Sequence, residues 1–260
     1  MSIYAVNGKE PIAAWIPSLD TAGNGTTTLT DLVGSNDGTL TGMDAATDWV
    51  ADTDAGGIRA LDFDGVDDYV EIPSSSDFQF GNGTSDSPFS VSFWVNQNGF
   101  GAGDFINRKD STATQRLWRI ILSGSSAQFL FVLYDDPPVN RIESEVSTVT
   151  IDDGDWHHVV CKYDGSGNQN GLDIWFDNNQ QTQTKRANGT YVAMENFSFP
   201  IWIARAGAAY SQFKADDIRI FDTALDASDI AYLYNSGNGR GIVATTPNTR
   251  RRRYAGGYGL

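Results

Sequence analysis

Hydrophobic and polar residues alternate along much of this chain. In the stretch PFSVSFWVN, Phe89, Val91 and Phe93 occupy every second position with serines between them, which is the pattern of a strand with one buried face. Similar apolar runs recur, separated by turn sequences such as SGSS, DDPP and DGSGNQNG. The predicted strands are 13–16, 58–63, 69–72, 89–95, 117–122, 128–134, 156–163, 172–176, 201–204 and 217–221. Many short strands between turns are typical of a sandwich or barrel.

Helical periodicity is found in one late segment, residues 227–234. Its apolar residues Ile230 and Leu233 fall on one helical face, and Asp226 or Ser228 is a candidate for the N-cap. The pattern therefore predicts a single short helix. We expect this helix to cover an open end of the sandwich.

Composition and charge narrow the classes of protein. The chain has 260 residues, 40% of them hydrophobic and 12% aromatic, so disorder over most of its length is not expected. Its net charge is −15, and the last fifteen residues hold four arginines and no acid, so the rest carries −15 − 4 = −19. We expect no nucleic-acid partner for so acidic a body. The sequence has neither a signal-peptide pattern nor 18 consecutive apolar residues, so we expect no membrane span.

Three groups of sequence segments carry a family resemblance. They are ALDFDGVDDYVEI with PFSVSFWVN, DGDWHHVVCKYDG with LDIWFDN, and FKADDIRIFDTALDASDIAYLYNSG, in this order. Together they resemble the laminin-G-like branch of the concanavalin A-like lectin/glucanase superfamily. The resemblance implies an all-β jelly-roll sandwich of two curved antiparallel sheets. We expect residues 1–57 to supply strands and loops that complete the sandwich, 58–240 to form its core, and 241–260 to form a flexible basic tail.

The acidic stretch ALDFDGVDDYVEI raises the question of a metal. Members of the family often hold calcium where the early DFDG segment meets the late ADDIRI segment, and calcium binds six to eight oxygens. The resemblance thus implies Asp64, Asp67 and Asp216 as calcium ligands, since each lies at a turn or a strand end. The alternative is that these carboxylates cap turns and bind nothing.

Catalytic patterns are weak in this sequence. Glucanases of the superfamily place two acids at alternating positions of one strand. Glu143 and Glu145 have this spacing, but RIESEVSTVT lacks the aspartate and tryptophan neighbours of such enzymes, so we expect a solvated strand face. The adjacent His157 and His158 point to opposite faces of a strand and cannot chelate one metal together. We expect no catalytic residue and no enzyme activity.

The family usually binds glycans or protein surfaces, and exposed aromatic rings would stack on sugars. The candidate ligand-binding residues are Trp94, Trp118, Trp175 and Trp202. The tail offers a second surface, because a basic cluster with tyrosines fits an arm that docks on other virion proteins or on a second copy. Its candidate residues are Arg250, Arg251, Arg252, Arg253, Tyr254 and Tyr258.

Three functions are consistent with these patterns. The first is a phage virion protein, a head decoration or fibre-associated protein, that presents a glycan- or host-surface-binding sandwich on the virion surface. The second is an extracellular bacterial carbohydrate-binding module. The third is a glycoside hydrolase. The sequence leaves the glycan and the oligomeric state open.

Overall fold

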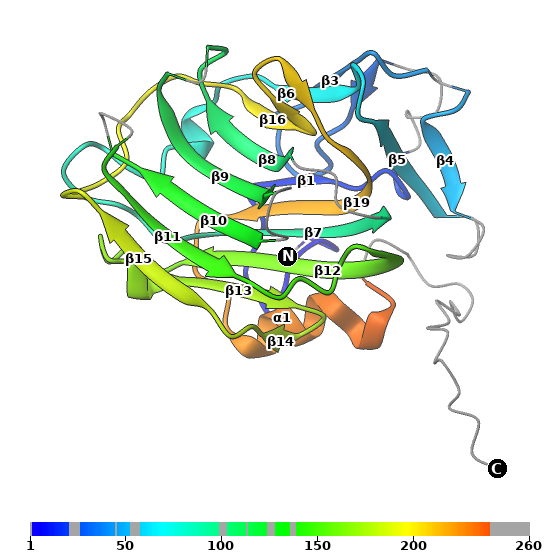
Figure 1. The fold of residues 1–260 in the computed structure, drawn as a ribbon. Coiled ribbons are helices and arrows are strands. Elements are labelled where there is room, and N and C mark those ends of the chain that lie inside the picture. The colour runs from blue at the N-terminus through cyan, green and yellow to red at the C-terminus, as the bar shows by residue number, and fades with distance from the viewer. Residues whose placement is uncertain are drawn as a thin grey trace.

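A computed structural model describes residues 2–20, 27–44, 46–52, 58–98, 103–112, 114–123, 128–135 and 139–239. Its strands form two large antiparallel sheets that face each other (Figure 1). The chain passes between the sheets repeatedly, so that strands distant in sequence become neighbours. This arrangement confirms the predicted all-β sandwich.

One sheet has eight strands. In order across the sheet they are β14 (Asn179–Gln180), β13 (Leu172–Phe176), β12 (Asp153–Tyr163), β7 (Phe89–Asn98), β19 (Gln212–Phe221), β5 (Ile58–Asp64) and β4 (Trp49–Asp52), with β1 (Ala13–Trp15) also paired to β19. Two strands from the first 57 residues, β1 and β4, thus lie in this sheet.

The other sheet has nine strands. In order they are β15 (Thr184–Asn188), β11 (Arg141–Val146), β10 (Gln128–Tyr134), β9 (Arg116–Ser123), β8 (Gly103–Lys109), β16 (Ile201–Ile203), β6 (Tyr69–Ile72), β3 (Gly38–Thr41) and β2 (Thr28–Leu29). A small hairpin of β17 (Arg205–Ala206) and β18 (Ala209–Tyr210) connects β16 to β19. The 3-10 helices are η1 (Ser76–Phe78), η2 (Gln169–Gly171) and η3 (Asn235–Gly237).

The inner faces of the two sheets bury an aromatic core. Phe89 on β7 stacks on Phe80 at a centroid distance of 4.3 Å and meets Phe131 of the opposite sheet edge-on at 5.8 Å. Such ring pairs add to the apolar burial that drives the sheets together. Cys161 lies in the same core, where burial raises the pKa of its thiol well above the usual value. It is a packing residue.

The predicted helix is present as α1 (Ala227–Tyr234), and Asp226 caps it by accepting hydrogen bonds from the N–H groups of Ser228 and Asp229. Its location differs from the expectation. The helix covers the outer face of the eight-stranded sheet beside β13 and β14, not an open end (Figure 1). The reason is a second apolar cluster between sheet and helix. Its buried members are Val6, Val160, Phe221, Leu225, Ile230 and Leu233.

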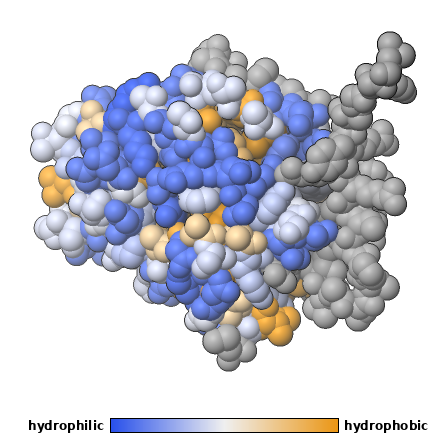
Figure 2. All heavy atoms as spheres, turned by 90° about the horizontal axis from the view of Figure 1, so that it is seen from below, coloured by the Kyte–Doolittle hydropathy of each residue, from blue (hydrophilic) through white to orange (hydrophobic). Residues whose placement is uncertain are grey.

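The side of the molecule that carries α1 is mainly hydrophilic, with small separated apolar areas (Figure 2). This agrees with the burial of the apolar residues of α1 against the sheet. In the part of the chain that the structure describes, no helix is long and apolar enough to cross a membrane.

Candidate functional site

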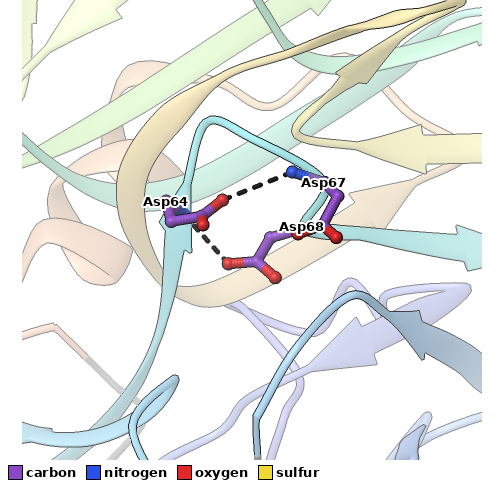
Figure 3. A group of neighbouring side chains, drawn as sticks. All are labelled: Asp64, Asp67 and Asp68. Atoms are coloured by element: carbon purple, nitrogen blue, oxygen red, sulfur yellow. Dashed lines mark hydrogen bonds between the residues drawn. The ribbon is translucent and has the colours of Figure 1, made fainter.

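Three carboxylates meet in the turn between β5 and β6, residues 64–68, here called the acidic turn. Asp64 Oδ1 accepts hydrogen bonds from the backbone N–H groups of Val66 (2.7 Å) and Asp67 (3.4 Å). Asp68 Oδ2 accepts one from the N–H of Asp64 at 3.0 Å (Figure 3). Gly65 has φ of 78°, a conformation that favours glycine. The turn is therefore fixed by its own side chains.

The acidic turn concentrates negative charge. One carboxylate oxygen from each of Asp64, Asp67 and Asp68 lies within 4.8 Å of the others. Burial raises the pKa of Asp68 to about 6, and the charges of Asp64, Asp48 and Asp67 add to this rise. Crowded carboxylates of this kind fit a hard cation with oxygen ligands.

The predicted calcium ligands are only partly brought together. Asp64 and Asp67 lie side by side as expected, and Asp68 joins them. Asp216 lies apart, because Gln212 is opposite Asp64 and Asp216 is four residues further along β19, about 13 Å away. Its carboxylate instead accepts a hydrogen bond from the N–H of Asp217 at 2.8 Å.

An aromatic cluster follows the acidic turn directly. The ring centroids of Tyr69, the first residue of β6, and Tyr210 in the hairpin are 6.0 Å apart. The guanidinium carbon of Arg205 lies 4.4 Å from the centroid of Tyr69 and 4.5 Å from that of Trp202. Trp202 Nε1 in turn donates to the carboxylate of Glu71 at 3.0 Å. We call these five residues the hairpin end of the sandwich.

The hairpin is held in one position by hydrogen bonds from side chains to backbone carbonyls. Ala204 has φ of 65°, which turns the chain out of β16 into the hairpin. Asn107 Nδ2 donates to the carbonyl of Arg205 at 2.6 Å, and Arg205 Nε donates to the carbonyl of Gly207 at 2.9 Å. Ser211 Oγ donates to the carbonyl of Asp104 at 3.0 Å. The rings and the guanidinium are thus preorganised before any ligand arrives.

The hairpin end combines groups that suit a polyhydroxylated ligand. Tyr69, Glu71, Arg205 and Tyr210 are half-buried, so part of each faces solvent, while Trp202 is buried beneath Arg205. Aromatic faces stack on the apolar faces of rings. A carboxylate accepts and a guanidinium donates in fixed planes, which matches paired hydroxyl groups.

The predicted tryptophans lie elsewhere or beneath the surface. Trp94, Trp118 and Trp202 are 2%, 1% and 2% exposed. Trp94 lies on the outer face of the eight-stranded sheet, with ring centroids 5.2 Å from His158 and 6.0 Å from Tyr234. Trp118 belongs to the main core. Burial of this degree leaves these three rings no face for a sugar in the described structure.

Trp175 is half-buried and packs against the apolar cluster under α1. The residues that pattern reasoning missed are Tyr69, Arg205 and Tyr210. A tyrosine directly after the acidic turn was visible in the sequence, but the hairpin that brings Arg205 and Tyr210 to it has no strong apolar pattern. The pairing of distant strands creates this neighbourhood.

Glu143 and Glu145 are buried and ion-paired, which corrects the expectation of a solvated face. They are 8% and 5% exposed on one side of β11. Arg141 Nε donates to Glu143 at 2.8 Å, and Arg186 contacts both carboxylates. Because arginines already occupy these oxygens, the pair holds the edge of the sheet together.

The two histidines point to opposite faces, as predicted. His158 Nε2 lies 2.9 Å from Ser92 Oγ. His157 lies between Asp177 and Asp153, with ring nitrogens 2.8 and 3.0 Å from their carboxylates. They therefore belong to separate hydrogen-bond groups. The tail residues Arg250, Arg251, Arg252, Arg253, Tyr254 and Tyr258 lie outside the described residues.

The two sheets define a jelly-roll domain with a polar and aromatic site at one end. A laminin G family model, described as the concanavalin A-like lectin/glucanases superfamily, matches residues 63–231. The chain belongs to this superfamily, which confirms the resemblance seen in the sequence. None of the curated protein sequences matches the chain.

Solved structures share the fold at low identity. The receptor binding domain of botulinum neurotoxin C/D mosaic serotype has a TM-score of 0.62 and 13% identity, covering 86% of this chain and 51% of that chain. The binding domain of Paraclostridial Mosquitocidal Protein 1 has 0.60 and 14%, covering 87% and 52%. Trypanosoma rangeli sialidase in complex with sialic acid has 0.56 and 13%, covering 88% and 33%. This chain thus spans about half of the toxin domains and a third of the sialidase.

Proposed function

We propose that this chain is a non-catalytic glycan-binding domain and that the sugar binds at the hairpin end. The observation that carries the proposal is a fixed group in which Tyr210 packs on Tyr69 and Arg205 lies over Tyr69, next to the carboxylate of Glu71. A sugar ring on the tyrosines would keep its hydroxyl groups within reach of both planar side chains. Preorganisation of this group lowers the entropy lost on binding.

The compared structures support a glycan as the ligand class. One botulinum neurotoxin DC binding domain is described in complex with SialylT, and cell entry of botulinum neurotoxin type C is described as dependent upon two ganglioside molecules. Another neurotoxin DC binding domain is described in complex with rat synaptotagmin II, so a protein ligand is the competing class. The polar planar groups beside half-buried tyrosines favour a sugar.

Hydrolysis is not part of the proposal. Glycosidases need one carboxylate to donate a proton and another to act on the sugar or on water. The pair with strand-face spacing, Glu143 and Glu145, is bound by Arg141 and Arg186. A bacterial carbohydrate-binding module is a form of the proposed function, and neighbouring genes for polysaccharide degradation would favour it.

The proposal is tested by binding of the chain to an array of glycans. Tyr210→Ala should abolish binding to the glycans that the natural chain binds on the array. Tyr210→Phe should keep most of this binding, because stacking needs the ring and not the hydroxyl. Trp175→Ala serves as the control, since Trp175 is the predicted platform that is not buried. Loss of binding with Trp175→Ala but not with Tyr210→Ala would place the glycan elsewhere and contradict the proposal.

Calcium binding and a place on a virion surface stay predictions. The acidic turn suits calcium through Asp64, Asp67 and Asp68, and a bound ion would supply a fixed positive charge beside Tyr69. The virion prediction rests on the lectin-like fold and the arginine- and tyrosine-containing tail. Capsid genes beside the coding sequence and the protein in purified particles would support it.

A further inference from the structure

Most lysines and arginines in the described part of the chain have a carboxylate partner. Those with a carboxylate partner are Lys9, Lys109, Arg119, Arg141, Lys162, Lys185, Arg186, Lys214 and Arg219. With a net charge of −15, such pairing is easy to satisfy. A lysine or arginine without a carboxylate partner is therefore uncommon among the described residues.

Arg205 is such a cation. Within the described ranges its guanidinium contacts two aromatic rings and one backbone carbonyl, and no carboxylate pairs with it. Glu71, the acid closest in the cluster, is bound to Trp202 Nε1 at 3.0 Å. Arg205 Nε is taken by the carbonyl of Gly207, so the two Nη groups remain to donate.

The position of this guanidinium is fixed. Its carbon lies 4.4 Å from the centroid of Tyr69 and 4.5 Å from that of Trp202, and stacking on two rings holds the plane of the fork. The carbonyl of the same residue is anchored to Asn107 of β8. A planar fork held in this way suits a carboxylate, which accepts two parallel hydrogen bonds.

We propose that the ligand of the hairpin end is an acidic sugar and that Arg205 binds its carboxylate. This inference rests on the proposed glycan-binding function and names the sugar class. In this arrangement the sugar ring contacts Tyr210 and Tyr69, and Glu71 accepts a hydrogen bond from a hydroxyl group. Arg205 then gains a carboxylate partner, as the nine paired cations named above already have.

The negative charge around the site favours a ligand that carries a single carboxylate. The carboxylates of Asp64, Asp67 and Asp68 directly precede Tyr69 in the chain, and the whole protein is strongly acidic. These negative charges disfavour a ligand with many anionic groups. Arg205 can pair with one of those groups, and the others would be repelled by the carboxylates. A sugar with one carboxylate and several hydroxyl groups fits better than a polysulfated chain.

The test uses two matched pairs of probes and calorimetric titration of the full chain. The methyl glycosides of N-acetylneuraminic acid and of glucuronic acid are each compared with the corresponding neutral methyl ester. We expect one acid at least to bind about 10- to 100-fold more tightly than its ester, as for loss of a charged hydrogen bond. Equal affinity of acid and ester in both pairs would overturn the inference, and so would tighter binding of galactose 3-sulfate.

Variants of single arginines test whether Arg205 causes the preference for the acid over its ester. Arg205→Gln should remove the preference for the acid over its ester, and Arg205→Lys should keep only part of it, because a lysine lacks the planar fork. Arg186→Gln is the matched control, since it removes the same charge from a side chain 48% exposed on the distant edge strand β15. It should leave the preference unchanged, and equal effects of Arg186→Gln and Arg205→Gln would contradict a specific contact.

The results distinguish the acidic-sugar proposal from the broader proposal that the hairpin end binds a glycan. If esters and neutral glycans bind and Tyr210→Ala abolishes this binding, but acids have no advantage, glycan binding stands and the carboxylate assignment is wrong. If acids, esters and neutral glycans all fail to bind, both are wrong. Melting curves of each variant check that the chain is folded.

Discussion

At the scale of single residues, His157 is the clearest titratable contact. Its Nδ1 lies 2.8 Å from the carboxylate of Asp177 and its Nε2 lies 3.0 Å from that of Asp153. Only the protonated ring donates at both nitrogens. Burial opposes the charged ring, but the two carboxylates outweigh it and raise the pKa of His157 above its usual value. The charged ring ties the start of β12 to the β13–β14 turn.

This contact predicts a pH dependence of stability. A raised pKa in the folded state contributes stability that is complete below the unfolded value, about 6.5, and is lost as the pH rises through the folded value. The melting temperature should therefore fall on going from pH 6 to pH 9. His157→Gln should reduce that fall. An identical pH profile in the variant would show that His157 does not cause it.

Asp68 gives a pH dependence of the same direction, but here the fold disfavours the charged form of the side chain. Its folded pKa is about 6, above the usual value of a carboxyl group, so the folded state binds a proton more tightly than the unfolded state. Stability should fall as the pH rises from about 4 to about 6. Asp68→Asn removes the cost of ionisation and should raise the free energy of unfolding at pH 7 by about 1 kcal/mol without metal. Urea unfolding measures this, and a loss of stability would contradict it.

Bound calcium should make the ionised carboxylate of Asp68 stabilise the fold, whereas without the ion it destabilises the fold. If the acidic turn binds the ion, added calcium stabilises the native state by mass action and raises the melting temperature of the natural chain. Asp68→Asn and Asp64→Asn should lessen this rise, whereas Asp216→Asn should leave it, because Asp216 lies apart from the turn. An unchanged melting curve in both calcium and excess chelator would remove the site.

At the scale of elements, strand β8 is held by a buried arginine. Arg108 is 1% exposed and donates to the backbone carbonyls of Phe78, Phe197 and Phe199. Burial lowers the pKa of Arg108 to about 10. One side chain thus binds carbonyl groups of two separate segments and ties both of them to β8.

Removing this arginine should weaken the whole domain. Arg108→Met removes these three hydrogen bonds and should lower the free energy of unfolding by about 2–4 kcal/mol. Lys214→Met on β19 is the control and should change it little, because the ion pair of Lys214 with Asp62 is exposed on both sides. Similar losses in urea unfolding for the two variants would contradict the role of Arg108.

The strands differ in how far the sequence could predict them. The bounds of β6, β10, β13 and α1 coincide with the apolar pattern. Strand β8, GDFINRK, was missed because the pattern treats charged residues as solvent-exposed. Here Asp104 and Lys109 are 1% and 2% exposed and pair at 3.6 Å. Arg119 of β9 also donates to Asp104, at 2.9 Å, so the burial of these charges depends on a neighbouring strand.

The site was predictable in part for a similar reason. The acidic turn is local, and its sequence indicated Asp64 and Asp67 correctly as neighbours. We expected tryptophans to form the aromatic surface of the site. Tryptophan side chains are large and apolar, however, and three of the four are buried. Tyr69 and Tyr210 meet only because β6, β16 and the hairpin are brought together by long-range pairing. No pattern in a single stretch contains this information.

At the scale of the whole molecule, the tail remains a separate prediction. Deletion of residues 246–260 should leave the melting temperature unchanged while the chain fails to join its particle or oligomer. The physical reason is that a docking arm contributes to assembly and not to the core. The reverse result, lower thermal stability with normal assembly, would mean that the arginines pair with the acidic body instead.

The central claim is that one end of the sandwich binds a sugar. It is tested most directly by mapping amide chemical shifts of the labelled chain during titration with a glycan that binds on the array. We expect the shifts to concentrate around Tyr69, Arg205 and Tyr210, with smaller changes in the acidic turn. Shifts confined to the outer faces of β10 and β11, or to α1, would contradict it.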